Sequence, residues 1–115
     1  MAWDDVSRWQ PVDLYAAFRM GDAVLPVDVR DRGYAEATEQ IRSSIRVDPQ
    51  EFESQIASLP DDRELIFYCE RPDEATSMKI ALWAFDNGKS RVGVIIGGWD
   101  AWVAAGYPVE PKAAA

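Results

Sequence analysis

Residues 65–77 have the sequence Leu-Ile-Phe-Tyr-Cys-Glu-Arg-Pro-Asp-Glu-Ala-Thr-Ser. The first four are continuously apolar rather than alternating, which is typical of a parallel strand covered on both faces. Apolar residues then recur at helical spacing over residues 75–86, and Asn87 and Gly88 supply a left-handed stop. This part of the chain therefore predicts a buried strand, a polar loop that begins at Cys69, and a helix.

The flanking sequence continues the alternation of strands and helices. Strands are expected over residues 23–29, 44–47 and 92–96, helices from Pro11 to the stop at Gly21 and over residues 49–58 and 99–105, and a helical turn over residues 34–40. Pro26 lacks an N–H, so we expect it where its strand needs no donor. Short connections between such elements predict an open α/β domain with a largely parallel sheet. Ligands of these sheets bind beyond the carboxyl ends of strands, which is where Cys69 falls.

The chain has 115 residues, the usual size of one domain. We expect a single domain over residues 1–115, with its core at about residues 11–110 and a tail at residues 111–115. The first residues carry no basic and apolar signal segment, and no apolar run is long enough to cross a membrane. These features predict a cytoplasmic protein without direct membrane contact, and leave open whether the chain is complete or part of a larger protein.

Charge and residue counts exclude several classes of function. Twenty acidic and twelve basic residues give a net charge of −8, which repels nucleic acid and anionic lipid. The absence of histidine removes Ser-His-Asp and Cys-His catalysis and most zinc sites. One cysteine cannot form an internal disulfide or a multi-thiolate metal site, and suits a reducing compartment. Any nucleophile in this chain must therefore work without a histidine base.

The loop from Cys69 to Ser77 is the candidate site. Backbone N–H groups of a loop between a strand and a helix, with the helix N-terminus behind them, converge on one point and stabilise an anion there. A sulfur at that point is held as thiolate or persulfide without histidine. A lone cysteine also often serves only in packing, so both interpretations of Cys69 remain open.

Three blocks of this sequence resemble the rhodanese domains, a sulfurtransferase family. They are Val-Asp-Val-Arg at residues 27–30, the loop at residues 69–77, and Gly-Gly-Trp-Asp-Ala-Trp-Val-Ala-Ala-Gly-Tyr-Pro-Val at residues 97–109. They occur in the family's order and spacing and cover roughly residues 11–110. The resemblance implies the rhodanese-like α/β fold, an open, largely parallel sheet of about five strands with helices on both faces.

The resemblance also implies roles for individual residues. Cys69 matches the catalytic cysteine, Ser77 matches the serine that closes the loop, and Asp28 and Arg30 match the supporting Asp-x-Arg. The substrate or anion-binding loop would consist of Glu70, Arg71, Pro72, Asp73, Glu74, Ala75, Thr76 and Ser77. The implied activity moves a sulfane sulfur from thiosulfate or a persulfide donor to a thiophilic acceptor, a thiol or a protein, through a Cys69 persulfide and with no cofactor or metal. The donor, the acceptor and the oligomeric state in the cell are left undetermined.

The loop departs from the common family form Cys-x-x-Gly-x-Arg-Ser. Pro72 replaces the glycine, no arginine precedes Ser77, and Cys69 and Ser77 are eight rather than six positions apart. The loop is more similar to a subgroup with Cys-x-Cys-Pro-Asn-Glu-Ala-x-Ser. The histidine and glycine of the family's His-Ile-x-Gly-Ala segment are also absent from residues 40–44.

Two other functions have to be weighed against sulfur transfer. Phosphatases of this fold place an arginine six positions after the cysteine, where this chain has Ala75, so phosphatase and arsenate reductase chemistry are disfavoured. Residues 70–74 carry a net charge of −2, which opposes a thiolate unless these side chains point outward. A weakly catalytic or non-catalytic rhodanese-fold module for partner binding or redox sensing is therefore the alternative.

The same residues also have purely structural interpretations. Asp28 and Arg30 fit a structural charge pair, and Trp99 fits packing in the core or over the site. Glu70 fits a solvated loop charge, and Ser77 a structural hydroxyl at a helix start.

Overall fold

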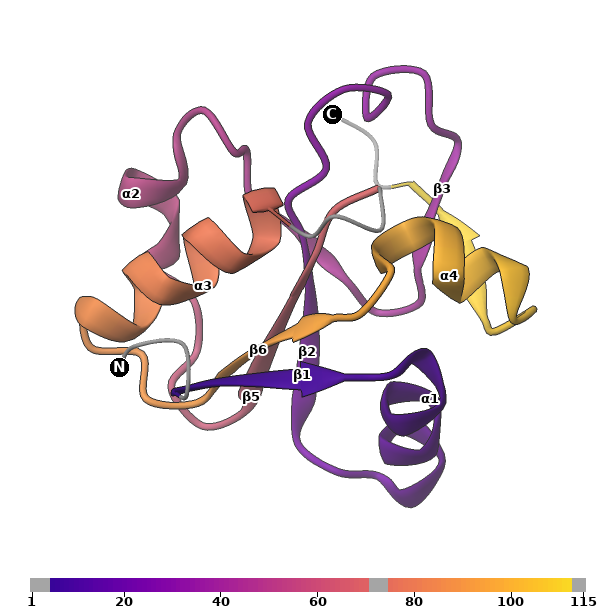
Figure 1. Cartoon of the computed structure of the whole chain (residues 1–115), viewed down its shortest axis with the longest axis horizontal. Coiled ribbons are helices and arrows are strands. Elements are labelled where there is room, and N and C mark those ends of the chain that lie inside the picture. The colour runs from indigo at the N-terminus through magenta and orange to yellow at the C-terminus, as the bar shows by residue number, and fades with distance from the viewer. Residues whose placement is uncertain (1–4, 71–74, 113–115) are drawn as a thin grey trace.

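The computed structural model of the chain describes residues 5–70 and 75–112. Figure 1 shows the arrangement of the elements and labels most of them. In chain order they are β1 (Val6–Trp9), α1 (Pro11–Met20), β2 (Val24–Asp28), β3 (Glu39–Ile41), β4 (Ile45–Arg46), α2 (Phe52–Ile56), β5 (Glu64–Tyr68), α3 (Ala75–Asp86), β6 (Val92–Ile95), α4 (Gly98–Ala104) and β7 (Val109–Pro111).

A parallel sheet of five strands in the order β1-β6-β5-β2-β4 forms the centre of the molecule, and β3 pairs with β7 in a separate two-stranded antiparallel sheet. Helices α2 and α3 cover one face of the large sheet, and α1 and α4 cover the other (Figure 1). The expected α/β fold, with helices on both faces of a parallel sheet, is confirmed.

The central strand β5 contributes side chains to both halves of the core. Leu65 and Phe67 pack in the cluster beneath α2 and α3, whereas Ile66 and Tyr68 pack in the cluster beneath α1 and α4. All four side chains are buried. Their continuous apolar sequence follows from this position, because successive side chains of a strand point to opposite faces and both faces are covered.

Helix boundaries follow local signals in the sequence. Helix α3 spans the expected residues 75–86. Helix α1 begins at Pro11 and ends at Gly21, whose φ of 72° lies in the left-handed region that glycine adopts without strain. Helix α2 is shorter than the expected residues 49–58, because the Asp48 carboxylate accepts the N–H of Gln50 and turns the chain before the helix begins. None of the helices in residues 5–70 and 75–112 is both long and apolar enough to cross a bilayer.

Pro26 lies where its strand needs no donor. The backbone C=O of Ala23 and the N–H of Val29 both bond to the β5 side. Bonding directions alternate along a strand, so the nitrogen of Pro26 faces the other side, where β4 pairs only with Val27 and Asp28.

Three short strands were not expected from the sequence, and two of them correct other expectations. The helical turn expected over residues 34–40 ends at residue 36, and Glu39–Ile41 form β3 instead. The tail was expected to begin at residue 111. Instead, Pro111 belongs to β7, and the Lys112 N–H donates to the Thr38 C=O at 2.9 Å. The remaining unexpected strand, β1, has only four residues, Val-Ser-Arg-Trp, and pairs with β6 at the sheet edge.

Candidate functional site

Cys69 follows the last residue of β5 and is 4% exposed. Its Sγ lies 3.6 Å from the Ser77 Oγ, to which the thiol donates a hydrogen bond. Ser77 is fully buried in the first turns of α3. The carboxyl end of the central strand and the N-terminal part of a twelve-residue helix therefore meet at the sulfur atom.

The backbone that carries Cys69 is fixed by helix α4. The Cys69 C=O accepts the N–H of Trp99 at 2.7 Å, and the Glu70 C=O accepts the N–H of Asp100 at 3.2 Å. These N–H groups belong to the first turn of α4, which has no helical acceptors for them. They hold the strand end in place, so an anion at the sulfur would need other donors.

The remaining loop residues expected at the site have different positions. Arg71, Pro72, Asp73 and Glu74 lie outside the described residues. Ala75 is exposed at the start of α3, and Thr76 is half-buried next to it. The position six residues after Cys69 thus presents a methyl group and no guanidinium.

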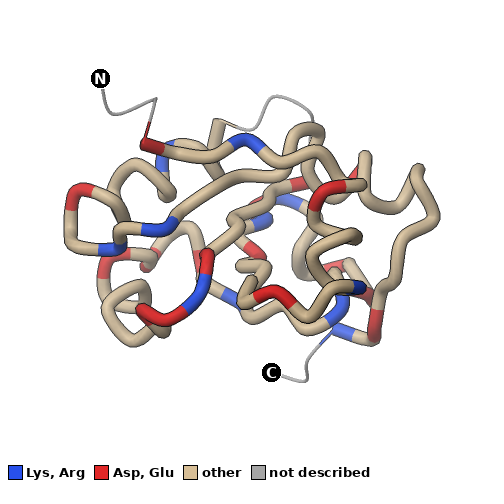
Figure 2. Tube along the Cα trace, turned by 90° about the horizontal axis from the view of Figure 1, so that it is seen from below, with Lys and Arg blue, Asp and Glu red and all other residues tan. Residues whose placement is uncertain are grey.

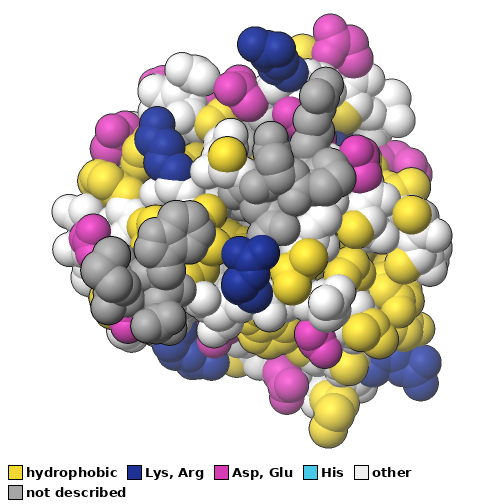
Figure 3. All heavy atoms as spheres, in the orientation of Figure 1, with side chains coloured by type: hydrophobic (Ala, Val, Ile, Leu, Met, Phe, Trp, Pro, Cys, Tyr) yellow, Lys and Arg dark blue, Asp and Glu magenta, His cyan; other side chains and the backbone are white. Residues whose placement is uncertain are grey.

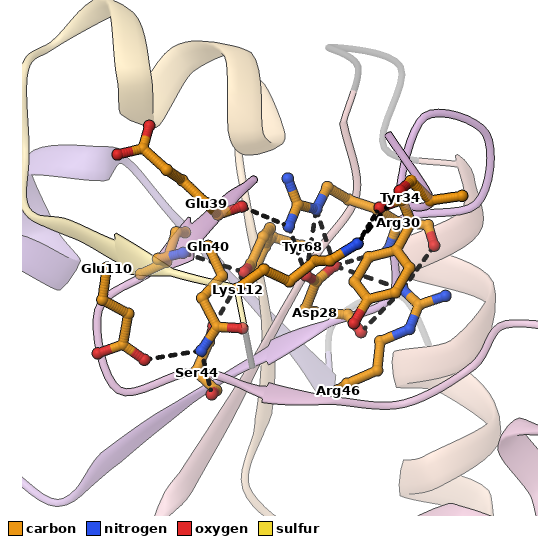
Figure 4. Close-up of polar contacts among 12 residues, drawn as sticks. Asp28, Arg30, Tyr34, Glu39, Gln40, Ser44, Arg46, Tyr68, Glu110 and Lys112 are labelled. Carbon is orange, nitrogen blue, oxygen red and sulfur yellow. Dashed lines mark hydrogen bonds and ion pairs between the residues drawn. The ribbon is translucent and has the colours of Figure 1, made fainter. Parts of the chain in front are cut away.

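Asp28 and Arg30 form an ion pair inside the protein (Figure 4). The Arg30 Nη2 lies 2.8 Å from the Asp28 Oδ2, and the Arg30 Nε donates to both carboxylate oxygens at 3.0 and 3.1 Å. Only 2% of Arg30 and 1% of Asp28 is exposed, because the Trp99 ring lies 4.5 Å from the guanidinium and the Glu39 C=O also accepts from the Arg30 Nη2. The expected structural charge pair is present, and it is buried rather than on the surface.

Two further cations extend this cluster and were not singled out from the sequence. The Arg46 Nη1 donates to the Arg30 C=O at 2.6 Å, and the Arg46 guanidinium lies 3.6 Å from the centre of the Tyr34 ring. The Lys112 Nζ lies 4.1 Å from the same ring centre and donates to the Tyr34 C=O (Figure 4). Nothing in the spacing of these residues indicated the contact, because they come from three segments that only the fold brings together.

Burial and neighbouring charges shift the pKa values of Arg30 and Tyr68. Burial by itself would lower the pKa of Arg30, but its hydrogen bond to Asp28 and the negative charges of the surrounding groups outweigh burial and raise the pKa. Burial, reinforced by Asp28, raises the pKa of Tyr68, whose hydroxyl contacts the Ser44 hydroxyl and accepts the Ile41 N–H. Both groups therefore keep one charge state near neutral pH, with Arg30 cationic and Tyr68 uncharged.

Glu70 differs from the solvated loop charge that the sequence suggested. Its Oε2 is buried and has no hydrogen-bond partner among the described residues. Burial raises the pKa of this carboxyl, and the backbone N–H of Asp31 and the charge of Arg30 only partly oppose the effect. Glu70 therefore holds a proton to higher pH than an exposed glutamate would.

Acidic and basic residues are interspersed along the chain trace, as Figure 2 shows. Within the described ranges, no three His, Cys, Asp or Glu side chains lie close enough together to hold a metal ion. The described polar side chain that contacts the sulfur is therefore the Ser77 hydroxyl rather than a metal-binding cluster.

Comparisons with known proteins agree with the fold described above. The family model for the Rhodanese-like domain matches residues 10–105. The solved structure of the BH2092 protein from Bacillus halodurans is 26% identical, covers 90% of this chain and 76% of that chain, and superposes with a TM-score of 0.76. A protein from Rhodopseudomonas palustris, described as of unknown function and a possible tyrosine phosphatase, is 29% identical over 95% of this chain and 88% of that chain, with a TM-score of 0.73.

A more distant structure, Ygr203w from Saccharomyces cerevisiae, is described as a homologue of single-domain rhodanese and the Cdc25 phosphatase catalytic domain. It is 17% identical over 91% of this chain and 90% of that chain, with a TM-score of 0.70, and is similar in fold. No curated protein matches the chain.

Proposed function

Because this chain belongs to the rhodanese-like domain family, we propose that it is a sulfurtransferase whose nucleophile is the Cys69 thiolate. The observation that carries the proposal is the position of Cys69 at the end of the central strand, with its Sγ 3.6 Å from the Ser77 hydroxyl on α3. The donor is thiosulfate or a persulfide, and the acceptor is a thiol, a protein or, in an assay, cyanide.

The reaction proceeds in two displacements at sulfur. The Cys69 thiolate attacks the outer sulfur of thiosulfate, a sulfur–sulfur bond forms, and sulfite leaves with the electron pair of the bond that breaks. The acceptor then attacks the terminal sulfur of the Cys69 persulfide, and the thiolate leaves with its electron pair. Such a cycle needs stabilised sulfur anions and does not need histidine.

The described residues supply part of that stabilisation. The Ser77 hydroxyl donates to the sulfur once Cys69 has lost its proton. The first turns of α3 place the positive end of a helix dipole beside the same atom. The raised pKa of Glu70 favours the uncharged form of the residue that follows Cys69, which reduces the negative charge of the loop.

Sulfur transfer fits these residues better than phosphoryl transfer. A transferring phosphoryl group needs a guanidinium that binds two of its oxygens, and Ala75 stands where phosphatases of this fold place that arginine. The guanidinium of Arg30 is a poor replacement, because it is buried beside the Trp99 ring and already donates to Asp28 and to the Glu39 C=O.

Intact-protein mass spectrometry after incubation with thiosulfate, and separately with an organic persulfide, tests the proposal. We expect one extra sulfur on the wild type, none on Cys69→Ser, and removal of the sulfur by cyanide. Ser77→Ala keeps the same nucleophile and should load about tenfold more slowly, the equivalent of one hydrogen bond. An adduct that persists in Cys69→Ser, or no adduct with either donor, would contradict the proposal.

The rate of thiol alkylation distinguishes the alternative function, redox sensing, from sulfur transfer. A Cys69 that reacts quickly with iodoacetamide but takes no sulfur from either donor would instead indicate a module for redox sensing.

A further inference from the structure

A concave site lies at the end of the sheet opposite Cys69, where strands β2 and β5 begin. Its cavity has a volume of about 520 Å³, and we call it the arginine pocket after its main lining residues, Tyr15, Phe18, Arg19, Arg42, Arg63 and Pro108. Arg63 directly precedes β5 and Cys69 directly follows it. A strand rises about 3.3 Å per residue, so the two positions lie about 20 Å apart. A ligand in this pocket therefore cannot react at Cys69.

The pocket concentrates positive charge in a chain whose net charge is −8. Its three arginines come from α1, from the turn between β3 and β4, and from the loop before β5. No described carboxylate lies within ion-pair distance of Arg19 or Arg42, and Arg63 only approaches the exposed Asp62 at 3.7 Å. Asp22 is the single acidic residue of the lining. The Arg19 Nη1 donates to the Tyr15 hydroxyl at 3.4 Å, and the other N–H groups of Arg19 can still bind an anion.

The apolar wall of the pocket is held in place from behind. The Tyr15 ring stacks on Tyr107 with 4.6 Å between ring centres, and Phe18 meets Trp102 edge-on at 5.9 Å. Figure 3 shows hydrophobic side chains gathered in the lower right of the view, where Figure 1 places α1, with a basic side chain beside them. An aromatic or other flat apolar group can pack against rings that are already fixed.

The turn that carries Arg42 is also fixed by contacts outside the pocket. The Arg42 N–H donates to the Pro108 C=O at 3.3 Å, and the Ser43 N–H donates to the Glu110 Oε1 at 3.0 Å. Ser43 has a φ of 67°, a left-handed conformation that costs energy for a residue other than glycine and that these contacts maintain. The pocket is therefore formed before any ligand arrives.

From these features we propose that the arginine pocket binds a small organic anion with an aromatic or similarly flat apolar body. The guanidinium groups would bind its carboxylate, sulfonate or phosphate, and the Tyr15 and Phe18 rings would contact the body. The cavity volume lies within the range of small-molecule sites. This binding site is separate from sulfur transfer at Cys69.

Fluorescence titration with 8-anilinonaphthalene-1-sulfonate, an anion on an aromatic body, tests the proposal. We expect saturable binding at one site, weakened about tenfold or more in the double variant Arg19→Gln/Arg42→Gln, because each guanidinium contributes a charge-assisted hydrogen bond. N-phenyl-1-naphthylamine has the same aromatic body without the sulfonate, and its binding should not change in that variant. Amide resonances of Arg42 and Ser43 should shift in the NMR spectrum when the sulfonate binds.

Two controls isolate the pocket from other effects. Arg32→Gln removes the same charge from an exposed residue outside the pocket and should leave affinity unchanged. Cys69→Ser should also bind the probe normally, which keeps this test independent of the sulfurtransferase proposal. The proposal fails if the sulfonate does not bind saturably, if Arg32→Gln weakens binding as much as the double variant, or if the double variant binds as the wild type does.

Discussion

Replacing Asp28 with asparagine should strongly destabilise the protein, because it removes the negative charge beside a buried guanidinium. The carboxylate accepts hydrogen bonds from the Arg30 backbone N–H, Nε and Nη2, and the Arg46 Nη1 lies 3.5 Å away. Asparagine keeps the shape but offers one acceptor oxygen and no charge. Breaking a buried pair by neutralising one partner costs about 3–5 kcal/mol, and we expect a loss in that range.

Urea unfolding followed by tryptophan fluorescence measures this loss, with the slope of the transition as a check on two-state behaviour. Asp62→Asn is the matched control, because the Asp62 side chain is 81% exposed and its contact with Arg63 is 3.7 Å long. Exposed pairs contribute about 0–1 kcal/mol, so the control should unfold almost as the wild type does.

The two variants together make the reasoning refutable. If Asp28→Asn costs less than about 1 kcal/mol, or no more than Asp62→Asn, then the buried pair does not stabilise the protein as we infer. Adding Arg30→Met to Asp28→Asn should recover part of the loss, since it removes the unpaired buried charge. A double variant less stable than Asp28→Asn alone would show that Arg30 acts mainly through its contacts with Trp99 and Glu39.

Two further substitutions test local features. Glu70→Gln should gain stability over the wild type as pH rises from 4 to 7, because a carboxyl with a raised pKa in the folded state loses its stabilising contribution when it ionises; unfolding free energies at several pH values measure this. Gly97→Ala should cost about 2 kcal/mol or more in urea unfolding, because Gly97 has a φ of 80° and a Cβ there would lie 2.6 Å from the Ala101 Cβ.

Each of these expectations has an outcome that would contradict it. A stability difference between Glu70→Gln and the wild type that does not change with pH would mean that burial does not affect this carboxyl. Gly33→Ala is the control for Gly97→Ala, because Gly33 has the same φ of 80° and nothing within 4 Å of an added Cβ. If both alanine variants lose the same free energy of unfolding, backbone strain alone explains the loss, and the contact with Ala101 contributes nothing.

Elements with strong local signals could be predicted from the sequence, and elements defined by distant pairing could not. Helix α3 has apolar residues at helical spacing and a glycine stop, and its predicted bounds are confirmed. Strand β3 has only three residues and pairs with β7 near the other end of the chain, so the sequence places Glu39 and Gln40 in a helical turn instead. A strand that short carries too little pattern for its periodicity to be recognised.

In the candidate site too, contacts between residues close in sequence were predicted, and contacts between distant segments were not. Cys69 and Ser77 were expected on either side of one loop, and the structure brings their side chains together. The pairing of Asp28 with Arg30 was also expected, since the residues are two positions apart on one strand end. The burial of this pair was not expected, because the groups that cover it belong to Trp99 and Glu39, which lie in other parts of the sequence.

The order of strands in the large sheet has a consequence for how the protein folds. Among the described strands, β1 pairs with β6 alone, so residues 6–9 have no described sheet partner until residues 92–95 are available. Pairings between such distant segments close long loops before they gain contacts, which makes folding slow. On the ribosome, the first strand to be made is therefore the last to enter the large sheet, and until then β6 presents an open edge that a chaperone or a second copy can bind.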